Sequence, residues 1–452
     1  HYTVLGAGKS GMAAVMLLRA LNLQVALLDN DPDHVDEEAR RMMDSKGSAI
    51  FDSAAKLPEE TQALVLSPGV SIDHRLAEAA RDKNLRILGE LELASLAAPG
   101  GRPIAVTGTN GKTTVAMMID AILREAGMQP ITAGNIGLPW SRAILENPEP
   151  GPDLHWILEV SSFQLETIHY FHPHVSILLN ITPDHLDRHG TIEHYADLKG
   201  RITENQDEND VLIINQDDSR CLKIARDTRA RVLKYSTIRP VDEGCYLEGD
   251  LVMFQKAGMK PKRLFSINQL QMEGLHNISN AMAAACAAYV LGAGRKKIAS
   301  AMKGFSPNDH RMQYAGKING VRYINDSKAT NIDAMLSAVK SFSGQVHLIA
   351  GGHDKNSPFI LVAEQLAGQV KTAWLIGEAA NIIKGAWSAH VSCRNCITLE
   401  AALEESSAAA VPGDVVLLSP GCASFDQFDS YVERGDFFCK WVVSCQQKNR
   451  VF

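Results

Sequence analysis

The chain has 452 residues, of which 45% are hydrophobic and 21% charged, and its formal net charge is −7. This length exceeds that of one compact core and favours two to four domains, most simply three, while the composition excludes disordered and fibrous proteins. The negative charge gives no general attraction for nucleic acid or anionic lipid, so an anionic substrate must be held by local donors.

Three series of short apolar strands alternate with helix-like segments along the chain. The predicted strands lie within 2–8, 24–29, 63–69, 85–90, 103–107, 156–162, 175–182, 211–218, 321–327, 346–352, 372–378 and 414–421. Strands that alternate with helices imply mostly parallel, doubly wound sheets with ligands at the carboxyl ends of the strands. We therefore expect an α/β chain with domains at 1–97, 98–306 and 307–452, and a linker in the Pro/Gly stretch 97–103.

A first glycine loop, Gly6–Gly11, matches G-x-G-x-x-G directly after a strand and before a helix. In that position, backbone amides and a helix N-terminus receive a diphosphate. Asp29 ends the next strand, where a carboxylate binds ribose hydroxyls in nicotinamide or flavin sites. A dinucleotide site is thus one interpretation. A glycine turn that only allows tight packing is another.

A second loop, Thr107–Thr114, follows a strand and precedes a helix. Its backbone amides would wrap phosphates, Lys112 would neutralise the β and γ groups, and the Thr113 hydroxyl would ligate Mg²⁺. The loop is a variant, because Val106 stands where the general pattern has glycine. An ordinary dehydrogenase does not need this second phosphate loop.

Polar side chains follow later strands, at the expected carboxyl edge of the second sheet. Glu159 would complete a metal shell near a nucleotide, although alone it is equally a strand-edge charge. His185 would also ligate a metal. The His185/His189 spacing lacks the H-E-x-x-H order, which disfavours zinc. The remaining histidines of this region are interpreted as surface or turn residues: His169, His172 and His174.

Five segments, GTNGKTT, EVSSFQLE, NITPDHLDRH, HNISN and NDSKATN, occur in that order and resemble the signatures of the Mur ligase family. The resemblance covers essentially the whole chain. It implies a Rossmann-like domain for a UDP-sugar substrate, a central phosphate-loop ATPase, and a Rossmann-like C-terminal domain for the incoming amino acid.

The resemblance also implies site residues. It assigns ATP to Gly108, Thr109, Asn110, Gly111, Lys112, Thr113, Thr114, Asn277, Asn280, Arg311, Asp326 and Lys328. The UDP substrate is assigned to Gly8, Lys9, Ser10, Gly11, Asp29, Gly69, Asn135 and Ser161. Mg²⁺ ions are assigned to Thr113, Asn135, Glu159, His185 and Lys199, the last as a CO₂-derived carbamate. The implied catalytic residues are Lys112, His185, Lys199 and Arg311.

Segments 351–355 and 419–428 resemble the D-glutamate-adding branch of the family, and the D-N-P-R segment of diaminopimelate-adding relatives is absent. A cation with hydroxyl donors suits a dicarboxylate. The residues implied for D-glutamate are Thr330, Lys355, Ser424, Phe425 and Tyr431, the last where relatives carry Phe.

The resemblance implies an ATP-dependent ligase that adds D-glutamate to UDP-N-acetylmuramoyl-L-alanine through an acyl phosphate, in peptidoglycan precursor synthesis. The alternatives are a folylpolyglutamate synthase-like ligase, an NAD-dependent dehydrogenase and a catalytically silent nucleotide-binding scaffold. No apolar run approaches the roughly 18 residues that cross a bilayer, and no leader precedes the first strand. We therefore expect a cytoplasmic monomer with reduced cysteines, including the close pair Cys393 and Cys396.

Overall fold

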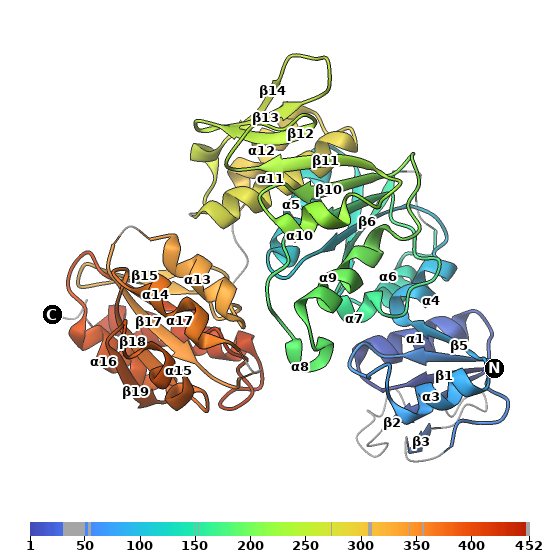
Figure 1. Cartoon of the computed structure of the whole chain (residues 1–452), viewed down its shortest axis with the longest axis horizontal. Coiled ribbons are helices and arrows are strands. Elements are labelled where there is room, and N and C mark those ends of the chain that lie inside the picture. The colour runs from blue at the N-terminus through green and yellow to red at the C-terminus, as the bar shows by residue number, and fades with distance from the viewer. Residues whose placement is uncertain are drawn as a thin grey trace. The chain divides into compact units, whose positions relative to one another are not determined.

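The computed structural model describes residues 1–29, 50–52, 56–149, 151, 153–272, 274–305, 310–342, 344–354 and 357–448. Contacts divide the chain into two compact units (Figure 1). Unit 1 comprises His1–Ile181, Glu193–Ile267 and Asn280–Met302, and unit 2 comprises Thr182–Ile192, Asn268–Ser279 and Lys303–Phe452. Lys355 and the predicted domain boundary at 306/307 lie outside the described residues.

The first sheet has the strand order β3-β2-β1-β4-β5, and all of its strands are parallel. Its elements are β1 (Tyr2–Leu5), α1 (Lys9–Ala20), β2 (Val25–Asp29), β3 (Ile50–Asp52), β4 (Ala63–Leu66), α3 (Arg75–Asp82), β5 (Arg86–Gly89) and α4 (Glu90–Ala97). Successive strand residues face opposite sides. Val4 packs in one cluster with Leu17 of α1, and Leu5 packs in another with Leu76 of α3. Helices therefore cover both faces, as predicted for a doubly wound sheet.

The central sheet has the order β14-β13-β12-β11-β10-β9-β6-β8-β7. Its strands are β6 (Arg102–Thr107), β7 (Gln129–Gly134), β8 (Leu154–Glu159), β9 (Val175–Leu178), β10 (Val211–Asn215), β11 (Arg231–Ser236), β12 (Gly244–Glu248), β13 (Leu251–Gln255) and β14 (Lys262–Ser266). Strands β6 to β12 pair in parallel, and β12, β13 and β14 form an antiparallel extension. Strand β6 lies between β8 and β9, so the loop that follows it leaves from the interior of the sheet.

Helices accompany the central sheet along the chain. They are α5 (Lys112–Glu125), α6 (Trp140–Glu146), α7 (Ser162–Leu165), α8 (Leu186–His189), α9 (Ile192–Gly200), α10 (Ser219–Ile224), α11 (Leu275–Val290) and α12 (Arg295–Gly304). Helix α5 directly continues the loop after β6. This is the strand-loop-helix arrangement that the second glycine motif predicted.

The third sheet has the order β15-β16-β20-β17-β18-β19, and only the pair β15 and β16 is antiparallel. Its elements are β15 (Gln313–Ile318), β16 (Val321–Asn325), α13 (Ile332–Lys340), β17 (Val346–Gly351), α14 (Ala363–Leu366), β18 (Val370–Ile376), α15 (Ala380–Trp387), β19 (Cys393–Ile397), α16 (Leu399–Ala409), β20 (Val415–Leu418) and α17 (Tyr431–Lys448). Leu348 packs with Leu336 of α13, whereas its neighbour Ile349 packs with Phe438 of α17. This sheet is also covered on both faces, so the α/β prediction with three mostly parallel sheets is confirmed.

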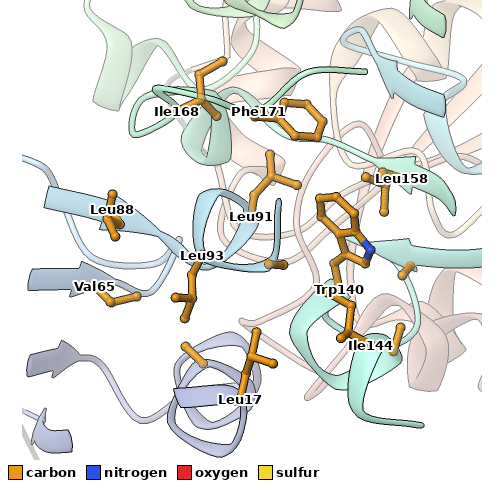
Figure 2. Packing of buried hydrophobic residues seen from close by; sticks show 14 of the residues in the cluster. Leu17, Val65, Leu88, Leu91, Leu93, Trp140, Ile144, Leu158, Ile168 and Phe171 are labelled. Carbon is orange, nitrogen blue, oxygen red and sulfur yellow. The ribbon is translucent and has the colours of Figure 1, made fainter. Parts of the chain in front are cut away.

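One hydrophobic core joins the first sheet to the helices of the central sheet within unit 1. Figure 2 shows Trp140 of α6 beside Leu91 of α4 and Leu158 of β8, and all three side chains are buried. The ring of Trp140 meets the edges of Trp156 and Phe171, each with a centroid separation of 6.1 Å. Large aromatic side chains contribute much of the apolar area in such cores. The shared core holds the first two predicted domains together in one unit.

The described helices include none that combines the length and apolar character needed to span a bilayer. All eight cysteines have free thiols. Cys393 and Cys396 lie on strand β19. Burial raises the pKa of Cys396 to about 11, which disfavours the thiolate that redox chemistry requires.

Candidate functional site

The loop after β6 has the backbone of a phosphate cradle. Gly108 and Gly111 adopt positive φ angles of 148° and 87°, which side chains with a Cβ rarely adopt. A Cβ on Gly111 would also lie 2.3 Å from Oδ1 of Asn280, so that side chain lies against the loop. Helix α5 begins directly after Gly111. Its first N–H groups therefore point into the loop, where an anion would be stabilised.

Lys112 is folded back over this loop. Its Nζ donates to the carbonyl oxygens of Gly108, at 2.8 Å, and Thr109, at 2.7 Å. These bonds keep the ammonium at the mouth of the cradle. A phosphate there would offer stronger, charge-assisted partners than two neutral carbonyls.

Asn180, two residues beyond the end of β9, holds the loop in shape. Its backbone carbonyl accepts from the N–H of Thr109 at 2.9 Å, and its side chain exchanges two hydrogen bonds with the backbone of Asn110, at 2.8 and 3.0 Å. Asn180 lies in the NITPDHLDRH segment, but the sequence analysis gave it no role. Its position directly after an apolar strand was the available signal.

A buried polar cluster lies beside the start of α5. The Thr113 hydroxyl donates to Oε2 of Glu159 at 2.7 Å, and Nδ2 of Asn135 donates to Oε1 of the same carboxylate at 3.0 Å. Glu159 is only 4% exposed. Three residues predicted as magnesium ligands therefore meet in unit 1. A hydroxyl, a carboxylate and an amide are oxygen ligands that suit Mg²⁺.

Lys199 also belongs to this cluster. Its side chain is 1% exposed, its Nζ donates to the carbonyl oxygen of Gly108 at 3.0 Å, and it lies 4.6 Å from the ring centroid of Tyr195. Gly108 therefore accepts hydrogen bonds from the nitrogens of both Lys112 and Lys199. Two like charges that share one carbonyl oxygen repel each other, so this arrangement favours a partner, or a modification, that neutralises one of them.

The first glycine loop is closed by tight contacts. The N–H of Ala7 donates to Oδ2 of Asp29 at 2.6 Å, so this carboxylate binds the loop itself. A Cβ on Gly11 would lie 1.8 Å from the carbonyl oxygen of Gly6. Helix α1 can approach β1 this closely only with glycine at position 11. The loop therefore has both the packing and the exposed helix N-terminus expected of a diphosphate site.

A pocket in unit 1 connects the first sheet with the segment after β8. It is lined by Leu66, Ser67, Pro68, Val70, Gly89, Glu90, Phe163, Gln164, Glu166 and Thr167. Ser161 caps α7 and exchanges hydrogen bonds with Gln164. Burial raises the pKa of Glu90, whose carboxylate accepts from the N–H of Ser141 at 2.6 Å. The pocket brings Ser67 and Pro68, which precede the predicted UDP residue Gly69, together with residues of the EVSSFQLE segment.

In unit 2, Arg311 and Asp326 lie near each other. Oδ2 of Asp326 accepts from the Ser419 hydroxyl at 2.8 Å, and Oδ1 accepts from the N–H of Met312 at 3.2 Å. Burial raises the pKa of Asp326 to about 7, although these hydrogen bonds and Arg311 oppose the shift. Burial, aided by Arg311, lowers the pKa of His276 to about 4. The unit thus holds a neutral imidazole and a half-ionised carboxyl near a cation at neutral pH.

The raised pKa of Asp326 predicts a pH-dependent stability. Because the folded carboxyl holds its proton more tightly than an ordinary aspartate, whose pKa is 3.8, its contribution to stability is complete below pH 3.8 and is lost as pH rises through about 7. Asp326→Asn imitates the protonated form of this carboxyl. When the pH is raised from about 5.5 to about 8, values on either side of the shifted pKa, we expect this variant to lose less stability than wild type. Urea unfolding at both pH values measures this. The exposed Asp429→Asn should behave like wild type, and an equal slope in Asp326→Asn would contradict the expectation.

The residues predicted for D-glutamate occupy one end of unit 2. Ser424 is buried, whereas Phe425 is 73% exposed, and Thr330 is half-buried. Tyr431 begins α17, and Nζ of Lys328 lies 5.2 Å from its ring centroid. Lys355 lies outside the described residues. The role of these side chains in amino-acid binding stays a prediction.

Arg434 organises the loops that carry these residues, and the sequence analysis missed it. It is 1% exposed and donates to the hydroxyl and carbonyl of Ser327 and to the carbonyls of Cys422 and Ala423, at 2.8–3.3 Å. Burial lowers its pKa to about 10, so it stays charged at neutral pH. Its acceptors are mainly backbone carbonyls, which residue types alone do not reveal.

The remaining predicted residues are divided between the units. His185 belongs to unit 2, has a φ of 52° and precedes α8, and its N–H donates to Oδ1 of Asp184 at 3.0 Å. Asn277 also belongs to unit 2, whereas Asn280 belongs to unit 1. The approach of His185, Asn277 and Arg311 to the loop at Lys112 therefore stays a prediction.

Comparisons with known proteins identify the family. Residues 106–288 match the Mur ligase middle domain, and residues 310–422 match the Mur ligase glutamate ligase domain. A UDP-N-acetylmuramoylalanine–D-glutamate ligase of Koribacter versatilis is 40% identical over 99% of this chain and 98% of its own length. The chain belongs to the Mur ligase family. A ligase of the same name from Acidobacterium capsulatum is 38% identical over 98% of this chain and 95% of its own. The family predicted from the five motifs is thereby confirmed.

Solved Mur ligases share the fold. The UDP-N-acetylmuramate-alanine ligase of Thermotoga maritima has a TM-score of 0.58 at 17% identity, with 99% of both chains covered. A pseudomurein peptide ligase type C of Methanothermus fervidus has a TM-score of 0.61 at 17% identity, with 98% of this chain and 99% of that chain covered. Both likenesses extend over nearly the whole length, so the three sheets are those of the Mur ligase fold.

Proposed function

We propose that this chain is an ATP-dependent ligase that joins D-glutamate to UDP-N-acetylmuramoyl-L-alanine in peptidoglycan precursor synthesis. The observation that carries the proposal is the full-length identity of about 40% to relatives that bear this activity in their names. The phosphate cradle at Gly108–Lys112 agrees with it, because a ligase of this class must hold a nucleoside triphosphate. We expect the reaction to take place in the cytoplasm, where ATP is supplied.

The proposed reaction has two steps. A carboxylate oxygen of the alanyl group attacks the γ-phosphorus of ATP, the bond to the β-phosphate oxygen breaks, and ADP leaves with that electron pair. The amine of D-glutamate then attacks the acyl phosphate, phosphate leaves, and the amine loses one proton to solvent. The protein mainly positions reactants and neutralises charge in such reactions. Lys112 would exchange its two carbonyl partners for phosphate oxygens, and the N-terminus of α5 would face the same group.

We assign one Mg²⁺ to Thr113, Asn135 and Glu159. Their polar atoms already meet around one buried carboxylate, and they become an oxygen ligand set when the Asn135 amide turns its oxygen inward. When bound, Mg²⁺ supplies charge neutralisation to the phosphates. Lys199 reaches the same loop as Lys112, and a carbamate on it would convert the repulsion between the two lysines into attraction. His185 is proposed for a second Mg²⁺.

We assign the UDP part of the substrate to the first glycine loop, at Gly8–Gly11 with Asp29, and to Gly69, Asn135 and Ser161. The pocket that joins Ser67 and Pro68 to Gln164 supports this assignment, because it links the first sheet with the ATPase sheet inside unit 1. A substrate bound by both would carry its carboxylate toward the phosphate cradle. A nicotinamide dehydrogenase would leave the second loop without a use.

Phosphate release tests this proposal. It should require ATP, UDP-N-acetylmuramoyl-L-alanine and D-glutamate together, and L-glutamate, D-alanine or diaminopimelate should not replace D-glutamate. A folylpolyglutamate synthase would instead respond to a folate, and a dehydrogenase would bind NADH. Release that proceeds equally with L-glutamate would contradict the assigned amino acid, and no release with any combination would indicate a silent scaffold.

A further inference from the structure

We propose a zinc site, formed by His172, His174, Asp207 and Asp210, at the amino end of the central sheet. None of these residues belongs to the nucleotide cradle. His172 and His174 stand in the turn before β9, and Asp207 and Asp210 stand in the turn before β10. Because β9 and β10 are parallel neighbours, the two turns meet at the same edge of the sheet.

The ligand atoms already lie close together. One each from His172, Asp207 and Asp210 all fall within 4.8 Å of one another. Nε2 of His172 lies 2.5 Å from Oδ2 of Asp210, and Nδ1 of His174 lies 3.3 Å from Oδ1 of the same carboxylate. Ligands of a tetrahedral zinc ion lie about 2 Å from the metal and hence about 3.3 Å from each other. Small side-chain rotations in exposed turns would bring the set to that geometry.

The protein scaffold around the carboxylates is built to hold them. Asp210 is buried, and its Oδ2 accepts from the N–H of Asp207 at 2.9 Å, which orients the carboxylate within the turn before β10. Asp207 is half-buried, and its Oδ1 accepts from the N–H of Asn209 at 2.8 Å. Such outer hydrogen bonds orient metal ligands.

A further histidine lies beside the set. His155 on β8 is 7% exposed, and its Nδ1 has no hydrogen-bond partner among the described residues. Imidazole nitrogen is a common metal ligand. The amino ends of β8, β9 and β10 thus concentrate imidazoles and carboxylates.

The chemistry selects zinc over magnesium. Imidazole nitrogen suits zinc and similar transition metals, whereas magnesium takes oxygen ligands and keeps its waters. A bound ion would take the place of the direct contact between Nε2 of His172 and Oδ2 of Asp210. The site lies one strand length from the nucleotide loop, about 15–20 Å for strands of this size. The ion would therefore join two turns of the ATPase sheet and would not contact the reactants.

Zinc titration of the full chain tests the site. We expect a chelator-competition titration in excess Mg²⁺ to show one tight zinc equivalent in wild type. His172→Gln with His174→Gln should weaken that equivalent about 100-fold or more. Asp207→Asn should weaken it as well, and because it keeps the acceptor for Asn209, its folding should be unaffected. The exposed His390→Gln serves as the matched control and should bind like wild type.

Substitution of zinc by cobalt distinguishes metal bound at this site from metal bound to cysteine thiols. We expect the visible spectrum of a tetrahedral Co²⁺ complex without a thiolate charge-transfer band, and we expect it to vanish in the double histidine variant. The proposal is overturned if wild type binds no tight zinc, or if the variants at 172, 174 and 207 bind as His390→Gln does. A thiolate band would overturn it too, since it would place the metal on cysteines.

Discussion

Replacing Lys112 with alanine is expected to abolish ligation, with a loss of about 10³-fold or more in kcat, as for other groups that stabilise developing charge. The ammonium already sits over the phosphate cradle, within 2.8 Å of the Gly108 carbonyl. Alanine would leave the cradle without this charge while preserving the helix. Phosphate release in the presence of both substrates measures turnover, and calorimetry with the UDP-sugar measures binding to the first domain.

UDP-sugar binding should persist in Lys112→Ala, because the first glycine loop is a separate structure on the first sheet. Lys297→Ala is the matched control. Lys297 is an exposed lysine of the same unit, paired with Glu125 at 3.3 Å, and its loss should leave turnover unchanged. Loss of UDP-sugar binding together with turnover would contradict the assignment of the two loops to two ligands. Unchanged turnover in Lys112→Ala would show that the loop at Gly108–Lys112 does not take part in the reaction.

The strands that the sequence revealed are those with continuous apolar runs. Strand β17 is buried along its whole length and β10 at every residue but its last, as interior strands of parallel sheets are, and their apolar runs stand out. Strands β13 and β19 were not predicted. The residues of β13 alternate between buried and half-buried, and those of β19 are mostly exposed, because β13 lies near a sheet edge and β19 lies at one. Such strands are specified by pairing with neighbours, and a single segment does not contain that information.

The proximity of the predicted magnesium residues is the part of the site that the sequence anticipated. Glu159 ends β8, Asn135 follows β7, and Thr113 lies in the first turn of α5, and the three meet at the carboxyl edge of one sheet. Asn180 and Arg434 were missed because each acts on backbone atoms of a distant loop. Backbone carbonyls and N–H groups are present at nearly every residue, so only the fold shows which of them need a partner.

The arrangement of Lys112 and Lys199 could not be read from either segment. They are far apart in sequence, yet both donate to the carbonyl oxygen of Gly108. Lys112 belongs to a phosphate-loop motif, but Lys199 alone resembles an ordinary helix residue. Their convergence results from the position of α9 against the loop, and it gives a physical reason for the modification that the family resemblance only implied.

Conversion of Lys199 to a carbamate is expected to be essential for ligation. Lys199→Ala should lower kcat about 10²–10³-fold, the usual loss when a charged group at a metal or phosphate site is removed. Lys199→Arg should be equally inactive, because guanidinium keeps the positive charge and forms no stable carbamate. If ligation needed only the positive charge of Lys199, Lys199→Arg would instead keep much of the activity. The exposed Lys223→Ala, on α10, should retain full activity.

Two measurements distinguish a carbamylated Lys199 from an unmodified Lys199 with a structural role. Carbon-13 NMR of the enzyme in labelled bicarbonate should show a carbamate signal in wild type and in Lys223→Ala but not in Lys199→Arg. Acetate or formate should restore part of the activity of Lys199→Ala, because a small carboxylate can occupy the space beside Tyr195 and supply the missing negative charge. An active Lys199→Arg without a carbamate signal in wild type would show that the buried ammonium is the working form.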